Sequence, residues 1–204
     1  MPMDSMAQGA ANHGGENIFM EKQSTIRHLL ARGTVTDQIE EGICLALVLT
    51  WLANASPATR VINGTAAVVN AIFNQGSLVQ TWKADYSTVS TAGQQKLATS
   101  QFWFSYQARP FAAGKNIDQD ILTSQHAAGN VARFILCLQT SDHQYYAHAL
   151  GIRKMANNRD VYFYDPNYGA VLLPTIATFH TFLADFIQSL YTACDEWYIT
   201  GFLN

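Results

Sequence analysis

The feature that most constrains the fold is the apolar run from Ile43 to Leu52, in which only Thr50 is polar. Asp37 offers a helix N-cap ahead of the stretch "QIEEGICLALVLTWLAN". A helix that is apolar around its whole circumference is buried on every side. The run is much shorter than the roughly 20 apolar residues that cross a bilayer. The pattern therefore predicts a central helix inside a soluble globular domain.

Composition narrows the class of protein further. The chain has 204 residues, of which 49% are hydrophobic and 13% charged, enough to form one domain with a sizeable core. The formal net charge is −3, and the twelve basic residues are scattered rather than clustered. Neither a nucleic acid nor an anionic membrane surface is therefore an expected partner.

The cysteines and glycines do not indicate a metal or a cofactor. The three cysteines, Cys44, Cys137 and Cys194, form no CxxC pair, and the chain has no HExxH motif. The glycines form neither GxGxxG nor a phosphate-binding loop. We expect no metal, no cofactor and no disulfide scaffold.

The N-terminal segment differs in character from the rest of the chain. Residues 1–20 are rich in Gly, Ala, Asn and Met without a period, so we predict a flexible leader over 1–20 and a single domain over 21–204. The segment lacks the basic and apolar regions of a standard signal peptide. Secretion without such a peptide and a cytoplasmic location are both compatible with this.

The order of patterns predicts the fold class. Helical spacings dominate up to about residue 129, and short β-type runs follow: "VARFILCLQT", "QYYAHALGIRK", "DVYFYD" and "AVLLP". Residues 175–192 return to helical spacing, and "EWYITGFL" closes as a final strand. We therefore expect an α+β domain in which N-terminal helices pack on a C-terminal antiparallel sheet.

Three residues are candidates for nucleophilic catalysis. Cys44 alone is most often an inert small hydrophobe, but it stands near the start of the buried helix, where free N–H groups and the helix dipole stabilise a thiolate. If the hairpin turn centres between Ala156 and Asn157, His148 faces Asp165 directly, with β-carbons roughly 4.5 to 5.5 Å apart. Asp165 would then orient His148 as the base. A slip of one residue would put the two side chains on opposite faces.

Gln38 is a candidate for the oxyanion hole. It stands six positions before Cys44, so that its amide would join the backbone N–H of Cys44 in binding the oxyanion of a tetrahedral intermediate. A purely structural role at a helix start is an equal alternative for this residue.

The segments "EGICLALVLTW", "YAHAL" and "FYDPNYG", in this order, resemble the bacterial effector cysteine proteases of the YopT and AvrPphB family. The resemblance implies a papain-like fold with Cys44 as nucleophile, His148 as general base and acid, and Asp165 as the orienting carboxylate. The Cys-Gly-Ser-Cys-Trp signature of papain itself is absent. The implied protein is a secreted effector or toxin that enters a host or target cell and forms an acyl-enzyme with a protein substrate, with a secretion chaperone as a further partner.

Two alternatives stay open at the level of the sequence. A glutamine deamidase, a transglutaminase or an acyltransferase would use the same three residues, because all of them transfer an acyl group. A binding module on an inactive protease-like fold would need none of them.

Overall fold

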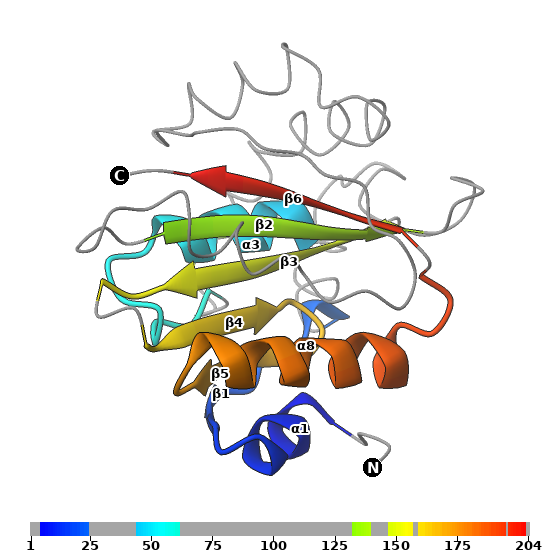
Figure 1. Ribbon diagram of the computed structural model, residues 1–204. Coiled ribbons are helices and arrows are strands. Elements are labelled where there is room, and N and C mark those ends of the chain that lie inside the picture. The colour runs from blue at the N-terminus through cyan, green and yellow to red at the C-terminus, as the bar shows by residue number, and fades with distance from the viewer. Residues whose placement is uncertain are drawn as a thin grey trace.

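The computed structural model describes residues 5–24, 44–61, 132–139, 147–156, 159–194 and 196–202 (Figure 1). The helices are α1 (Met6–Asn12), α3 (Cys44–Ala53) and α8 (Ile176–Leu190). The strands are β1 (Glu16–Phe19), β2 (Ala132–Gln139), β3 (Ala147–Lys154), β4 (Val161–Asp165), β5 (Gly169–Leu173) and β6 (Glu196–Phe202). Among the described helices, none is both long and apolar enough to cross a membrane.

The described strands form one antiparallel sheet in the order β1-β5-β4-β3-β2-β6. Strands β2 to β5 are neighbours in both sequence and space, which confirms the predicted meander. The final strand β6 joins the sheet beside β2, and the N-terminal strand β1 joins it beside β5. The α+β class predicted from the sequence is therefore confirmed.

The two longest described helices cover opposite faces of the sheet (Figure 1). On one face Trp51 of α3 lies so close to the sheet that a β-carbon on Gly151 would be 2.8 Å from its Cε3 atom. On the other face Phe163 contacts three phenylalanines of α8, with ring centroids 5.1 to 5.9 Å apart. Neighbouring residues of a strand point to opposite faces, so each strand contributes to both layers.

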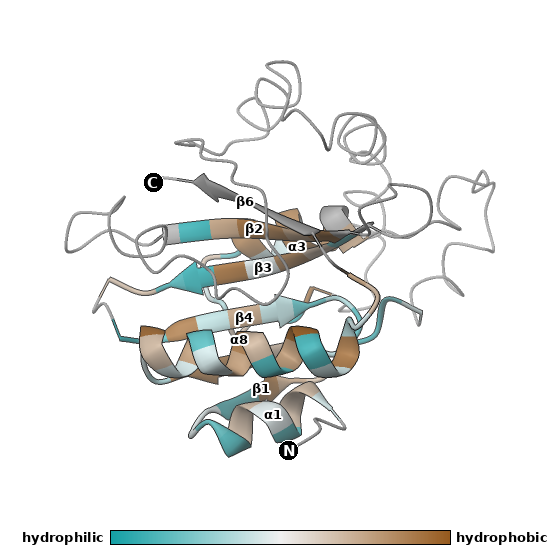
Figure 2. Ribbon diagram, turned by 45° about the vertical axis from the view of Figure 1, so that its right-hand side comes forward, coloured by the Kyte–Doolittle hydropathy of each residue, from teal (hydrophilic) through white to brown (hydrophobic). Residues whose placement is uncertain are grey.

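Helices α3 and α8 differ in how they are buried, and their composition explains the difference (Figure 2). Helix α3 is apolar along its length, as its sequence predicts, whereas α8 alternates apolar and polar residues and buries one face. Helix α8 begins with a capping box between Thr175 and Thr178 and ends at the C-cap residue Tyr191. This end of α8 reaches the site described below.

Polar contacts hold the C-terminal end of α3 on the sheet. The buried side chain of Arg153 on β3 donates to the carbonyl oxygens of Asn54 and Ala55, at 2.7 and 2.9 Å. These carbonyls follow the last turn of the helix, where a cation is favoured by the helix dipole. Trp51 Nε1 donates to the carbonyl of Pro57 at 2.9 Å, and its indole stacks on Tyr164. The helix that carries Cys44 is thus fixed in position and rotation.

Residues 5–20 do not form the flexible leader that the sequence predicts. Ser5 caps α1 by accepting a hydrogen bond from the backbone of Gln8, and α1 buries Met6 and Ala10. Strand β1 pairs with β5 and buries Phe19. A helix of seven residues and a strand of four are too short to show a period, and the small residues of α1 allow close packing that composition does not reveal.

Candidate active site

Asp165 ends strand β4 and begins a tight turn. Its backbone carbonyl accepts from Tyr168 N at 3.0 Å, and its Oδ1 accepts from Asn167 N at 2.7 Å. Gly169 closes the turn with a φ of 112°, a conformation that favours glycine. The Asp-Pro-Asn-Tyr-Gly segment is thus an ordinary turn that leaves its carboxylate fully buried.

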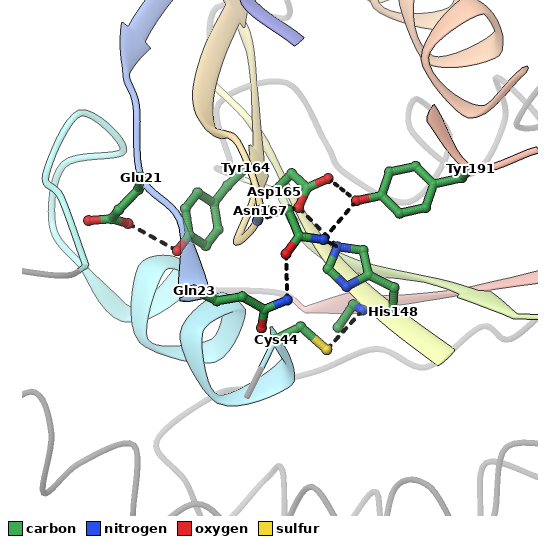
Figure 3. Close-up of polar contacts among 9 residues, drawn as sticks. Glu21, Gln23, Cys44, His148, Tyr164, Asp165, Asn167 and Tyr191 are labelled. Carbon is green, nitrogen blue, oxygen red and sulfur yellow. Dashed lines mark hydrogen bonds and ion pairs between the residues drawn. The ribbon is translucent and has the colours of Figure 1, made fainter. Parts of the chain in front are cut away.

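His148 lies on β3 and is 3% exposed. Its Nε2 is 2.9 Å from Asp165 Oδ1, which makes a buried ion pair when the imidazole is protonated (Figure 3). The other ring nitrogen, Nδ1, does not take part in this contact. The structure thus brings together the histidine and the aspartate that the sequence predicts as partners.

The predicted hairpin register is wrong by two residues. Gly151 pairs with Tyr164, whereas a turn centred between Ala156 and Asn157 would pair it with Tyr162. The loop is longer than predicted, because Met155 N donates to Asp160 O and the ladder closes only at Lys154 and Val161. Side-chain direction repeats every two residues, so an even shift keeps His148 and Asp165 on the same face. The carboxylate therefore reaches the imidazole diagonally rather than directly across.

Cys44 is the first residue of α3 and is 8% exposed. Its Sγ accepts a hydrogen bond from Ala149 N at 3.4 Å, and its side chain also hydrogen-bonds the side chain of His148. A backbone N–H and an imidazole are groups that stabilise a thiolate. The thiol, the imidazole and the carboxylate therefore stand in the order that nucleophilic catalysis requires.

The pKa of His148 results from opposing effects. Burial lowers it, but the charge of Asp165, the hydrogen bond to Asp165 and the contacts with Cys44 outweigh burial and raise the pKa from 6.5 to about 10. The imidazolium is therefore the stable form at neutral pH when its two partners are ionised. An imidazolium that is hydrogen-bonded to a sulfur in this way is a group that can donate its proton to a leaving group.

Three further residues join the site through hydrogen bonds that no sequence pattern predicts (Figure 3). Tyr191 Oη donates to Asp165 Oδ2 at 2.5 Å, and its ring stacks on the ring of His148. Asn167 Nδ2 donates to Tyr191 Oη at 3.2 Å, and Gln23 Nε2 donates to Asn167 Oδ1 at 2.5 Å. Asn167 belongs to the same turn as Asp165, whereas Gln23 and Tyr191 stand far from it in the sequence, so no local motif links the three residues.

A second buried pair lies beside Cys44, His148 and Asp165. Tyr164 Oη donates to Glu21 Oε2 at 3.1 Å, and both side chains are buried (Figure 3). Burial, the charge of Glu21 and the hydrogen bond to it raise the pKa of Tyr164 well above 10. The tyrosine therefore stays a neutral donor, and the segment that follows β1 is held against β4.

Two further predictions concern the oxyanion hole and the absence of a metal ion. Gln38, the predicted oxyanion-hole residue, lies outside the described residues. Within the described part of the chain, no group of three or more His, Cys, Asp or Glu side chains is arranged to hold a metal ion.

A family model described as Yersinia/Haemophilus virulence surface antigen matches residues 71–196, which include His148 and Asp165 and begin after Cys44. A comparison with curated protein sequences finds no match.

The fold is similar to that of the Pseudomonas avirulence protein AvrPphB, with a TM-score of 0.57 and 16% identity over 85% of this chain and 98% of that chain. The cysteine protease-like domain of the Photorhabdus asymbiotica toxin PaTox gives a TM-score of 0.41 at 14% identity, over 97% of this chain and 57% of that chain. The YopT domain of the Pasteurella multocida PfhB2 toxin gives 0.31 at 16% identity, over 92% of both chains.

Proposed function

The chain belongs to the peptidase family of the Yersinia/Haemophilus virulence surface antigens, and we propose that it is a thiol protease that works through Cys44, His148 and Asp165. Its fold is the papain-like α+β fold that the sequence resemblance implies. The observation that carries the proposal is the position of His148, buried between the carboxylate of Asp165 and the sulfur of Cys44.

The proposed reaction begins with the thiolate of Cys44 and the imidazolium of His148. The sulfur attacks the carbonyl carbon of a peptide bond, and the electron pair of the carbonyl moves to its oxygen. The backbone N–H of Cys44 is a candidate donor to this oxyanion, and Gln38 is proposed as the second. As the C–N bond breaks, His148 gives its proton to the leaving amine and an acyl-enzyme remains on the sulfur.

Water completes the proposed cycle. His148, now neutral, takes a proton from water while the hydroxide oxygen attacks the thioester carbon. The thiolate leaves, the carboxylic acid product dissociates, and the imidazolium is restored. Asp165 keeps its charge throughout, which holds the imidazole in one orientation and stabilises its protonated form.

The names of the relatives support a role outside the producing bacterium. The family is described as a virulence surface antigen, and the AvrPphB structure is that of an avirulence protein. We extend the proposal to a protein that is translocated into a host or target cell, cleaves a protein there, and is kept soluble before export by a secretion chaperone.

Terminal labelling and mass spectrometry test this proposal. Wild-type protein and the variants Cys44→Ser and Cys194→Ser are each incubated with a eukaryotic cell extract. New peptide termini should appear with the wild type and with Cys194→Ser, and be absent with Cys44→Ser. A mass increase of one dalton on glutamine, without new termini, would replace the protease with a deamidase. Equal patterns from all three proteins would contradict a catalytic Cys44.

A further inference from the structure

Tyr191 contacts two members of the proposed triad and has no role in the reaction described above. It is the C-cap residue of α8 and is 5% exposed. Its backbone N–H donates to Ile187 O at 3.0 Å, and its own carbonyl accepts from Cys194 N at 2.9 Å. The ring also packs against Phe186, with centroids 5.3 Å apart. The fold therefore fixes this side chain before any substrate binds.

We propose that Tyr191 is a positioning residue that holds the His148–Asp165 pair in its reactive geometry through two separate contacts. The inference rests on the proposed function. It acts through the two groups that it contacts, the imidazole of His148 and the carboxylate of Asp165.

The first contact is the hydrogen bond to the carboxylate. Asp165 is fully buried, and its Oδ1 already accepts from His148 Nε2 and Asn167 N. The other oxygen of Asp165, Oδ2, accepts a hydrogen bond from Tyr191 Oη. A carboxylate accepts only, so the single hydroxyl proton of Tyr191 must point at it. The carboxylate is thereby held at both oxygens and cannot rotate away from the imidazole.

The direction of this hydroxyl is fixed by a chain of amides. Gln23 Nε2 donates to Asn167 Oδ1, so the Nδ2 group of Asn167 must face the other way, toward Tyr191. Asn167 Nδ2 donates to Tyr191 Oη, which leaves the tyrosine proton for Asp165. A residue of the N-terminal segment thus sets the polarity of a hydrogen bond in the site.

The second contact is the stacking of the two rings. The ring centroids of Tyr191 and His148 lie 5.2 Å apart with an interplanar angle of 17°. An aromatic face attracts an imidazolium, and the parallel arrangement prevents the ring from turning out of its plane. Tyr191 therefore constrains both the imidazole of His148, which is the proposed acid and base, and the carboxylate of Asp165, which orients that imidazole.

Alkylation of Cys44 by iodoacetamide measures the effect without a substrate. The rate is followed by mass spectrometry across pH in the wild type, Tyr191→Phe, Tyr191→Leu and the control Tyr162→Phe. Tyr162 is a half-buried tyrosine on β4, and its side chain points to the opposite face of the sheet from His148. Cys137, which is buried in β2, reports general opening of the fold.

We expect the neutral-pH rate at Cys44 to fall about 10-fold in Tyr191→Phe, which keeps the ring but loses a hydrogen bond to a charged group. Tyr191→Leu loses both contacts and should react more slowly still, while Tyr162→Phe keeps the wild-type rate. The downfield proton resonance of the His148 Nε2–H···Asp165 bond should be retained in Tyr162→Phe and broadened in both Tyr191 variants. A residue that only packs the core would leave that resonance and the pH profile unchanged.

The outcomes separate this inference from the proposed function. If wild-type Cys44 reacts rapidly and Tyr191→Phe, still folded by its melting temperature, matches it in rate and resonance, the positioning role is overturned and the triad stands. If Cys44 is as inert as Cys137 in the wild type, the proposed function fails and the inference fails with it. If Tyr191→Leu unfolds, Tyr191→Phe decides alone.

Discussion

At the scale of the residue, the chemistry of this site depends on whether charge or burial decides the pKa of His148. Burial alone would keep the imidazole neutral, and its two partners reverse that preference. The contacts that stabilise the buried imidazolium are therefore also the ones that would keep its proton available for the proposed catalysis. Stability and chemistry depend on the same hydrogen bond.

Replacing Asp165 by Asn should lower the pKa of His148 from about 10 by several units, because burial then opposes a weaker set of attractions. The pKa is measured by NMR titration of the His148 ring. The matched control is Asp160→Asn, which removes a carboxylate just before the other end of β4. An unchanged titration in Asp165→Asn would show that the carboxylate does not determine the charge of the imidazole.

The same shift predicts the pH dependence of stability. The pKa of His148 is raised only in the folded state, so the stabilisation it brings is complete below about pH 6.5 and is lost as the pH rises through about 10. Urea unfolding between pH 6 and 11 should therefore show a decline in the wild type that is absent in His148→Gln. A parallel decline in both proteins would assign it to other groups.

Sequence reasoning located the three proposed catalytic residues because each stands in a local pattern: the start of an apolar helix, a histidine in an apolar strand, and an aspartate in a Pro-Asn-x-Gly turn. It could not identify Tyr191, which follows an amphipathic helix and belongs to no sequence motif. The contacts of Tyr191 arise only when α8 packs over β4, which is a tertiary event.

At the scale of the element, strand register explains why an incorrect detail left the site intact. The sequence predicted the strands of the hairpin but placed the turn one position too early, which shifts the pairing by two residues. A loop without a Gly-containing two-residue turn does not fix its own centre. Because side-chain direction alternates along a strand, the two-residue shift left His148 and Asp165 on the same face of the sheet. The hydrophobic alternation of β3 and β4 was enough to predict that shared face.

Helix α3 depends on Arg153 for its position. Burial and the charge of Arg133 lower the pKa of Arg153 to about 10, so it is still charged at neutral pH and its bonds to Asn54 O and Ala55 O are charge-assisted. Arg153→Gln should lower the free energy of unfolding by about 1.5–3 kcal/mol. It should also slow the alkylation of Cys44 at the opposite end of the helix.

Chemical denaturation and alkylation rates check the prediction for Arg153. Arg159→Gln, a change at an exposed arginine in the β3–β4 loop, is the matched control and should alter stability by less than about 0.5 kcal/mol. If Arg153→Gln is equally mild, the two hydrogen bonds do not anchor the helix.

At the scale of the whole molecule, the N-terminal segment is part of the domain. Deleting residues 1–24 would remove the buried side chains of Met6 and Phe19, which contribute about 1.5–3 kcal/mol each, and the contacts of Glu21 and Gln23 to the site. The shortened chain should unfold at a lower temperature and alkylate Cys44 more slowly. Melting curves and alkylation rates compare it with the full chain. An unaffected chain lacking residues 1–24 would instead favour the predicted flexible leader over 1–20.

The site takes its parts from every layer of the molecule: the sulfur from α3 on one face, the imidazole and carboxylate from the sheet, and the phenol from the end of α8 (Figure 3). These parts span positions 44 to 191 and meet only when both helices have docked. A nascent or unfolded chain therefore lacks this assembled group of side chains. Completion of folding is therefore the step that brings the proposed nucleophile together with its acid and base, and a chain kept unfolded would lack the proposed activity.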